Sequence, residues 1–306
     1  MKKKTIGIPR AFLYYRYNII WENFFTYLGF NVTTSSITTK EILEAGKKFS
    51  IDESCLSSKI YIGHINYLQD KCDYILVPRV CDYGKNEKVC VKFNALYDIV
   101  KNTFPKLNII SYNIEKTKGY RESISLIKLG IKMTKHPLRV IISYIRAYKK
   151  NKKHLKQEII KQEQNICSKK QKILIVSHPY NIYDNYIGRP ITELLKKHNF
   201  TLIYSDKLDR KKSKRNAKKI SPTLYWTYSK EIIGSIDYYK EKIDGIIFLT
   251  TFPCGPDSLV NELMIRKITT NPTLNILIDE LTSSTGLETR IESFIDIIKE
   301  RSATNG

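Results

Sequence analysis

The sequence predicts an α/β protein with two lobes, each built on a doubly wound parallel sheet, joined by a basic helical segment. Short apolar runs alternate with helix-like stretches over residues 5–111 and again over residues 172–299, which is typical of parallel sheets with crossover helices. Residues 116–171 lack strand signals and are rich in lysine. A length of 306 residues also favours two hydrophobic cores over one. We expect an N-terminal lobe over residues 1–115, a helical connector over 116–171 and a C-terminal lobe over 172–306.

The N-terminal lobe shows alternating strand and helix signals. Its first strand is bounded by Pro9, and the helix after it ends at Gly29, a residue type that commonly terminates helices. Thr38 or Thr39 can cap the next helix, with Glu41 in the first turn, where negative charge favours the helix dipole. The expected strands are residues 5–8, 30–34, 73–78 and 107–111, and the expected helices are residues 14–28, 39–48, 56–68 and 96–104.

The connector and the C-terminal lobe are interpreted in the same way. Apolar residues recur at helical spacing over residues 124–131 and 141–145, so the connector is expected to be helical. In the C-terminal lobe, Pro190 stands near the start of a helix, where its fixed φ is tolerated. The expected strands are residues 172–177, 201–204, 244–250 and 274–279, and the expected helices are residues 190–197, 231–239, 258–266 and 289–299.

The net charge of +22 bears on the class of partner. Much of the excess falls in residues 116–172 and 207–219, in a chain where lysine, isoleucine and asparagine are abundant throughout. A solvated basic surface explains this better than a nucleic-acid site, because no aromatic-stacking or helix-turn-helix signature accompanies the charge. No apolar run approaches the roughly 20 residues of a membrane helix, and no signal-peptide pattern precedes the first strand. We expect a cytoplasmic protein that uses neither membrane nor nucleic acid.

Four of the six cysteines are expected at one side of the molecule. Cys254 stands between two prolines at a strand-to-helix turn, where α/β sheets bind ligands and a helix N-terminus favours the thiolate. Cys81 directly follows a strand, Cys90 lies in the loop beyond it, and Cys55 lies at or near a helix start. The cleft between the two lobes is the natural place for Cys254 to meet the other three. Cytosolic thiols stay reduced, so a disulfide framework is not expected.

The other two cysteines do not fit this set. Cys72 lies at the amino end of its strand, where packing is its expected role, and Cys167 is an incidental thiol in the charged connector. The spacings lack C-x₂-C, which argues against a zinc ribbon or finger. Thiolate ligands from distant loops favour an iron–sulfur cluster over a hard metal. Zinc bound by four cysteines stays open at this point.

Several ordered motifs together resemble a known family. They are IGIPRA (6–11), DESC (52–55), VPR (77–79), Cys90 with KF (92–93), SHPYNIYD (177–184), FPCGPDS (252–258) and DELTSS (279–284) with TR (289–290). The chain resembles the uncharacterised domain linked to acyl-CoA dehydratase activases, the family labelled DUF2229. That family is related to the iron–sulfur subunits of 2-hydroxyacyl-CoA dehydratases and benzoyl-CoA reductases. The resemblance covers both lobes and is weakest over the basic connector.

The resemblance implies two Rossmann-like lobes around a cysteine-bound cluster, most simply [4Fe-4S], in an anaerobic system. Cys55, Cys90 and Cys254 match family positions. Cys81 does not, and is either a fourth ligand special to this chain or a neighbouring thiol. Val91 also departs from the family, where proline is usual. The implied function is electron transfer to a small substrate, such as an acyl-CoA; a non-catalytic accessory or scaffold protein and a zinc protein are the alternatives.

The resemblance also implies partners. The activases of such systems are ATPases with glycine-rich phosphate loops, and this sequence contains neither G-x-x-x-x-G-K-[ST] nor G-x-G-x-x-G. We therefore expect a separate ATP-dependent activase protein. Since related subunits pair, we also expect a homodimer.

Two arginines are further candidates, for cofactor binding. Arg10 and Arg79 follow strand segments at carboxyl ends, where a guanidinium can hold a phosphate or tune a cluster by hydrogen bonds. The simpler interpretation is an ion pair with Asp52, Glu53 or Asp82. His178 and His64 are the histidines expected nearest the site, with packing the simpler role for His64. The sequence designates no catalytic residue.

Overall fold

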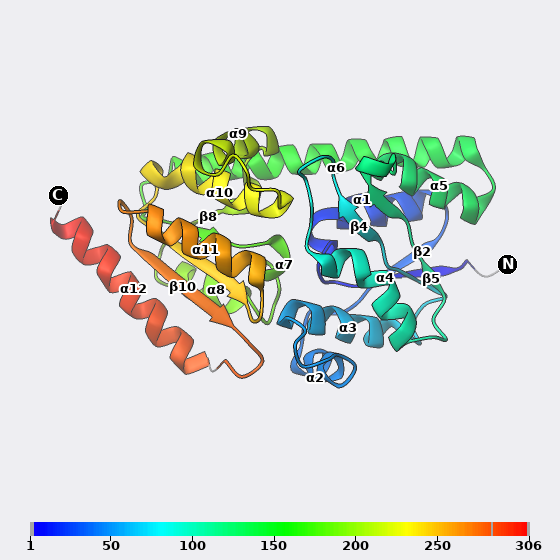
Figure 1. Cartoon of the computed structure of the whole chain (residues 1–306), viewed down its shortest axis with the longest axis horizontal. Coiled ribbons are helices and arrows are strands. Elements are labelled where there is room, and N and C mark those ends of the chain that lie inside the picture. The colour runs from blue at the N-terminus through cyan, green and yellow to red at the C-terminus, as the bar shows by residue number, and fades with distance from the viewer. Residues whose placement is uncertain (1–2, 283, 305–306) are drawn as a thin grey trace. The chain divides into compact units, whose positions relative to one another are not determined.

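The structure is a computed structural model that describes residues 3–282 and 284–304, so that Ser283 of the DELTSS motif and both chain ends lie outside it. The chain divides into two compact units. The first lobe comprises Met1–Lys156 with Tyr225–Thr227, and the second comprises Gln157–Leu224 with Tyr228–Gly306. Each lobe contains a four-stranded parallel sheet flanked by helices (Figure 1), which confirms the predicted fold class of two Rossmann-like lobes.

The first lobe is built on a sheet in the order β2-β1-β3-β5. Every neighbouring pair is parallel. The central strands bury their side chains on both faces, as parallel sheets covered by helices do. The strands are β1 (Thr5–Ile8), β2 (Asn31–Thr34), β3 (Tyr74–Leu76) and β5 (Ile109–Ile110).

Helices cover this sheet as the sequence predicts. Thr39 caps α2, since its hydroxyl accepts a hydrogen bond from the Ile42 amide. Helices α2 and α3 touch backbone to backbone, because a Cβ on Gly63 would lie 1.9 Å from the Ile42 carbonyl oxygen. No side chain fits there, so glycine is required. The helices are α1 (Tyr14–Tyr27), α2 (Lys40–Lys48), α3 (Leu56–Leu68) and α4 (Val91–Thr103).

A second, smaller parallel pair extends the first lobe. It consists of β4 (Arg79–Asp82) and β6 (Asn113–Glu115), which the sequence did not predict because neither strand is long enough to show a period. Beyond β4, Lys88 pairs with a segment far along the chain. The Lys88 amide donates to the Tyr225 carbonyl at 2.9 Å, and the Thr227 amide donates to the Lys88 carbonyl at 2.8 Å. These bonds explain why Tyr225–Thr227 belongs to the first lobe.

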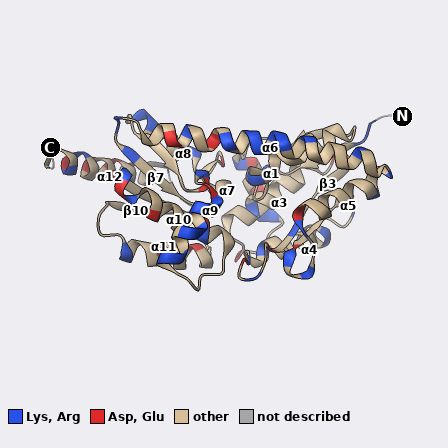
Figure 2. Ribbon diagram, turned by 90° about the horizontal axis from the view of Figure 1, so that it is seen from above, with Lys and Arg blue, Asp and Glu red and all other residues tan. Residues whose placement is uncertain are grey.

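The basic segment forms helices, as expected, without a strand over residues 116–171. A short 3₁₀ turn, η1 (Lys116–Lys118), leads into α5 (Glu122–Thr134) and the long α6 (Pro137–Ile166). Lys and Arg are spread along α6 and along α9 (Arg210–Ile220) (Figure 2). Within the described part of the chain, no helix combines the length and apolarity needed to cross a bilayer.

The second lobe repeats the architecture with its own sheet, in the order β10-β9-β7-β8 and parallel throughout. Helices α8 and α12 contact each other on one face, and α11 lies on the other (Figure 1). All seven residues of β9 are buried, which explains the apolar run that precedes its two final threonines. The strands are β7 (Lys172–Val176), β8 (Thr201–Tyr204), β9 (Gly245–Thr251) and β10 (Thr273–Ile278). The helices besides α9 are α7 (Pro179–Ile182), α8 (Arg189–Lys197), α10 (Thr227–Tyr239), α11 (Gly255–Lys267) and α12 (Ser284–Thr304).

Helix α9 was not predicted, because it has no apolar stripe. Asp209 caps it, accepting hydrogen bonds from the Lys211 and Lys212 amides at 3.0 and 3.1 Å. Its buried face consists of Ser213, Asn216 and Ala217. The helix therefore packs through small and polar side chains, which leave no hydrophobic periodicity in the sequence.

Candidate functional site

The carboxyl ends of the central strands carry the candidate residues in both lobes. In the first lobe the connections leave β1 and β3 in opposite directions, and such a reversal opens a ligand crevice at that edge. Arg10 follows β1 closely, and Arg79 follows β3. In the second lobe β7 and β9 form the corresponding reversal. His178 follows β7 there, and Cys254 follows β9.

Cys55 and Cys90 occupy equivalent positions, the N-caps of α3 and α4. Both side chains are half-buried. A helix N-terminus presents unpaired amides and partial positive charge, which favour a thiolate over a thiol. The Lys92 ammonium, in the first turn of α4, lies 3.5 Å from the hydroxyl of Ser54, the residue before Cys55. The starts of the two helices therefore adjoin. Helix α4 begins at Val91, earlier than predicted, so Cys90 is a cap rather than a loop residue.

Phe12 positions α3 against α4. Its ring stacks on Tyr61 of α3 with centroids 5.4 Å apart, and it tilts against Phe93 of α4 at 5.0 Å. All three rings are buried. Phe12 has a φ of 47°, a left-handed conformation that costs a bulky residue about 1–2 kcal/mol. Burial of its ring offsets that cost.

Three buried polar atoms of this region have no hydrogen-bond partner among residues 3–282 and 284–304: Nε of Arg10, the hydroxyl of Tyr61 and Nδ1 of His64. The other ring nitrogen of His64 lies 3.0 Å from Thr38 Oγ1. Burial, and then the Arg10 charge, lower the pKa of His64 to about 3, so its ring is neutral. Burial raises the pKa of Tyr61, which stays a phenol. Because buried polar atoms are normally paired, these three can serve a bound group.

Arg79 and Cys81 lie within β4, the short strand that comes after β3, so Cys81 is part of a strand rather than the residue that follows one. The Cys81 thiol donates a hydrogen bond to Asn94 Oδ1 at 2.8 Å. Burial, and then the Glu115 charge, raise the pKa of Cys81, which favours the thiol form. Arg79 donates to Asp98 Oδ2 at 2.6 Å. The ion pair of Arg79 is thus made with a carboxylate other than the three expected from the sequence.

The remaining two cysteines have simple surroundings. Cys72 donates a hydrogen bond to the Leu68 carbonyl at 3.3 Å, and burial raises its pKa to about 11. Its sulfur would lie 2.5 Å from a Cβ on Gly7, so it packs tightly against β1. Cys167 is exposed just beyond the end of α6. Neither thiol caps a helix.

In the second lobe Cys254 is the N-cap of α11 and is half-buried. The amide and hydroxyl of Ser258 both donate to the Cys254 carbonyl, at 3.0 and 2.8 Å. The preceding Phe252–Pro253 peptide is cis. Helix α11 begins at Gly255, with Pro256 in its first turn, where a missing amide hydrogen is tolerated. The sequence placed this helix start three residues too late.

A buried histidine–carboxylate pair supports the first turn of α11. His178 Nε2 lies 2.7 Å from Asp257 Oδ1, and both side chains are almost fully buried. The His178 ring stacks on Tyr180 at 5.0 Å and meets Tyr228 edge-on at 5.8 Å. Sequence reasoning singled out His178 but missed its partner. Asp257 stands three residues after Cys254 on a helix start, but this position alone does not identify His178 as its partner.

The chemistry of the donors fits a thiolate-bound metal group. Three half-buried thiols, and no other cysteine, cap helices. Among the residues that the structure describes, no group of three or more His, Cys, Asp and Glu side chains is arranged to hold a metal ion. The fit therefore rests on the donor type and on the helix termini behind each donor.

The chain matches a known protein family. The family model of the CoA enzyme activase uncharacterised domain (DUF2229) matches residues 5–208. The matched range contains Cys55, Cys81, Cys90 and His178, and it ends before Cys254. No curated protein matches the chain.

Proposed function

Because the chain belongs to the family of the CoA enzyme activase uncharacterised domain, as its motifs predicted, we propose that it is an iron–sulfur redox protein of a CoA-enzyme system. Cys55, Cys90 and Cys254 are the proposed ligands of a [4Fe-4S] cluster. Cys81 is a neighbouring thiol in this proposal, since its hydrogen bond to Asn94 and its raised pKa disfavour the thiolate. When bound, such a cluster supplies one-electron chemistry to a small substrate, such as an acyl-CoA.

One observation carries the proposal. Cys55 and Cys90, within the matched family region, and Cys254, beyond it, are the three cysteines that cap helices, while the other three lie in β4, between α3 and β3, and just beyond α6. For Cys55 and Cys90 the family match and the helix caps are independent of each other, and Cys254 adds the same cap in the second lobe. Amides of a first helical turn stabilise thiolates and can donate to cluster sulfurs. This coincidence supports a ligand role for these thiols over simple packing.

The residues around each thiol have supporting roles in the proposal. Lys92 brings positive charge to the adjoining starts of α3 and α4. Arg10, with a buried Nε that lacks a partner among the described residues, is the better placed of the two arginines to bind an anionic group, because Arg79 is engaged by Asp98. In the second lobe, Asp257 holds His178 and orients the first turn of α11. The burial of both side chains favours a structural role for His178 over activation of Cys254 as a nucleophile.

The proposed partners follow from the family. A separate ATP-dependent activase would deliver the electrons, because this sequence contains no phosphate-binding loop motif. We propose a homodimer as the working form. Size-exclusion chromatography with light scattering measures this directly, and a monomer at micromolar concentration would refute it.

Iron and sulfide quantitation with EPR on anaerobically purified protein tests the cluster. We expect brown protein with about four iron and four sulfide per chain. Cys55→Ala, Cys90→Ala and Cys254→Ala should each lose most of the iron, while Cys81→Ala and Cys72→Ala should keep it. Colourless protein without iron would refute the proposal. Stoichiometric zinc in place of iron would establish the zinc alternative.

The alternative is a non-catalytic accessory protein of the same system. The burial of the two candidate histidines favours it, because His178 and His64 are almost completely enclosed and contact Asp257 and Thr38. Turnover of an acyl-CoA by iron-loaded, reduced protein would rule this alternative out.

A further inference from the structure

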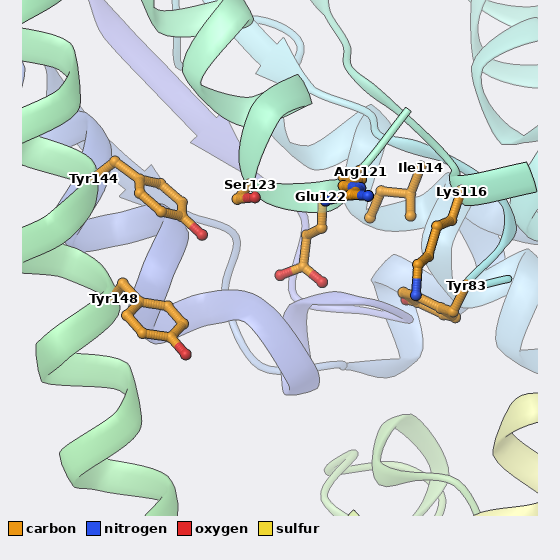
Figure 3. A pocket seen from close by; sticks show the side chains of 8 residues that line it. All are labelled: Tyr83, Ile114, Lys116, Arg121, Glu122, Ser123, Tyr144 and Tyr148. Carbon is orange, nitrogen blue, oxygen red and sulfur yellow. The ribbon is translucent and has the colours of Figure 1, made fainter. Parts of the chain in front are cut away.

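The first lobe contains a pocket that shares no residue with the cysteine sites. Its volume is about 490 Å³, which is ample for a small organic ligand. Figure 3 shows Tyr144 and Tyr148 of α6 on one side and Lys116 with Tyr83 on the other, with the Glu122 carboxylate between them. The pocket therefore has an aromatic side and a side that carries positive charge.

The fold gives this pocket the position of a ligand site. Tyr83 directly follows β4 and Lys116 directly follows β6, so both lie at the carboxyl end of a parallel pair. Parallel strands place ligands at that edge. Arg121 is the N-cap of the 13-residue helix α5, whose first turn adds positive potential. The carboxyl end of a parallel strand pair, the Arg121 side chain and the first turn of α5 all favour an anion, and all three lie at this pocket.

The loops that carry these residues are held in place by a buried carboxylate. Asp82 is completely buried and accepts hydrogen bonds from the Thr117 hydroxyl at 2.6 Å, the Thr117 amide at 3.0 Å and the Gly84 amide at 3.0 Å. It thereby ties the loop after β4 to the loop after β6. The position of Lys116 is preorganised by its neighbour in sequence rather than by a contact of its own side chain.

The two cations of the pocket are available to a ligand. Neither the Lys116 ammonium nor the Arg121 guanidinium has an ion pair or side-chain hydrogen bond among the described residues. Lys118, two residues from Lys116, instead pairs with Glu115 at 2.8 Å. A guanidinium and an ammonium in one pocket suit a phosphate, because the guanidinium binds it through two parallel hydrogen bonds.

The opposite side of the pocket suits a planar ring. Tyr144 and Tyr148 stack with centroids 6.1 Å apart at 21°, and Phe24 supports Tyr144 edge-on at 6.3 Å. Burial, and then the Glu122 charge, raise the pKa of Tyr144 to about 12, so it remains a neutral phenol. Nearly half of Tyr148 is exposed. An exposed ring in a row of aromatic side chains is a platform on which a base can stack.

Glu122 places a negative charge between the tyrosine side and the cationic side of the pocket. Its Oε2 accepts a hydrogen bond from the Tyr17 hydroxyl at 3.2 Å, and Tyr17 is itself 2.7 Å from the Tyr83 hydroxyl. A carboxylate fixed in the middle repels a second anion and accepts hydrogen bonds from amino or hydroxyl groups. A ligand therefore has its anionic group at one end only and hydrogen-bond donors in its middle.

We propose that this pocket binds a nucleoside phosphate. The phosphate lies against Lys116 and Arg121, donors of the sugar or base reach Glu122, and the base stacks on Tyr148. Binding needs no cluster, so the site stands whether or not the chain holds iron. The proposal concerns binding and includes no hydrolysis.

Isothermal titration of the full chain with AMP tests the site. We expect AMP to bind at least tenfold more tightly than adenosine or inorganic phosphate, since each of these lacks one end of the ligand. Lys116→Ala and Arg121→Ala should each weaken AMP binding about tenfold, and Tyr148→Ala severalfold. Lys118→Ala is the matched control, with the same charge change two residues away, and should leave the affinity unchanged.

Three results would overturn the proposal. The first is the absence of AMP binding at millimolar concentration. The second is an equal loss in Lys118→Ala and Lys116→Ala, which would show attraction by overall charge alone. The third is inorganic phosphate binding as tightly as AMP, which would show an anion site without ring recognition. All substituted side chains are exposed, and thermal unfolding of each variant verifies that it is folded.

Discussion

The two lobes hold their cysteine-bearing helices by different means. In the first lobe, apolar rings do so: Phe12 lies between Tyr61 of α3 and Phe93 of α4. In the second lobe, a polar contact does so: Asp257 of α11 binds His178 next to β7. The same local result, a thiol at a helix N-cap, is thus reached once by hydrophobic packing and once by a buried ionisable pair.

Because the contacts differ, the stability of the two lobes should respond differently to substitution and to pH. Packing responds to lost volume and hardly to pH, whereas a buried polar pair responds to the loss of either partner. The two buried histidines also have different partners in the two lobes. His64 is buried against a hydroxyl and keeps a neutral ring, while His178 faces a carboxylate. Each lobe can therefore be perturbed by a change that leaves the other intact.

The largest effect is expected from Phe93→Ala. The ring is buried and links α4 to Phe12, so its removal leaves a cavity and should lower the free energy of unfolding by about 3–5 kcal/mol. Denaturant unfolding followed by circular dichroism measures this. Val91→Ala, in the same helix but 76% exposed, is the control and should change stability little. Equal effects of the two substitutions would show that the aromatic contact does not hold α4.

A smaller loss is expected from Asp257→Ala in the second lobe. The change leaves the buried His178 ring without its acceptor, which should cost about 2–3 kcal/mol. Asp257→Asn keeps an acceptor of the same shape and should recover part of this loss. If Asp257→Asn destabilises the protein as much as Asp257→Ala, the carboxylate charge rather than the hydrogen bond is what matters.

The smallest effect is the pH dependence from His64. Its pKa is about 3 in the folded chain, against an ordinary value near 6.5, so between these pH values the unfolded chain binds a proton that the folded chain does not. Stability therefore falls as pH drops below 6.5, by about 2 kcal/mol between pH 7 and pH 5. Chemical denaturation at the two pH values measures it. His64→Gln should lose this part of the pH dependence; an unchanged slope would assign it to other groups.

Most of the fold could be predicted from the sequence. Strands β1 and β8 and helix α3 have the predicted boundaries, because their apolar patterns are strong. Strands β4 and β6 and helix α9 were not predicted because none of them shows a hydrophobic period in the sequence. Strands β4 and β6 are too short for a period, and α9 buries serine, asparagine and alanine rather than an apolar stripe.

The candidate site was predicted less completely. The sequence indicated the helix start at Cys55 and a strand-to-helix turn at Cys254, although it placed the helix after Cys254 three residues too late. It could not pair His178 with Asp257, which are 79 residues apart, or Arg79 with Asp98, because such contacts depend on tertiary packing. The stacked pair of Tyr144 and Tyr148 was missed because, in the sequence, both residues are ordinary positions of a long helix.

The hydrogen bonds between Lys88 and Tyr225–Thr227 affect when the first lobe can finish folding during synthesis. During synthesis the first lobe cannot finish its hydrogen bonding until residue 227 has left the ribosome, long after its own sheet is complete. The matched family region stops at residue 208, before this segment. No single cut in the chain can therefore release the first lobe whole: ending it at Lys156 strips Lys88 of both main-chain partners.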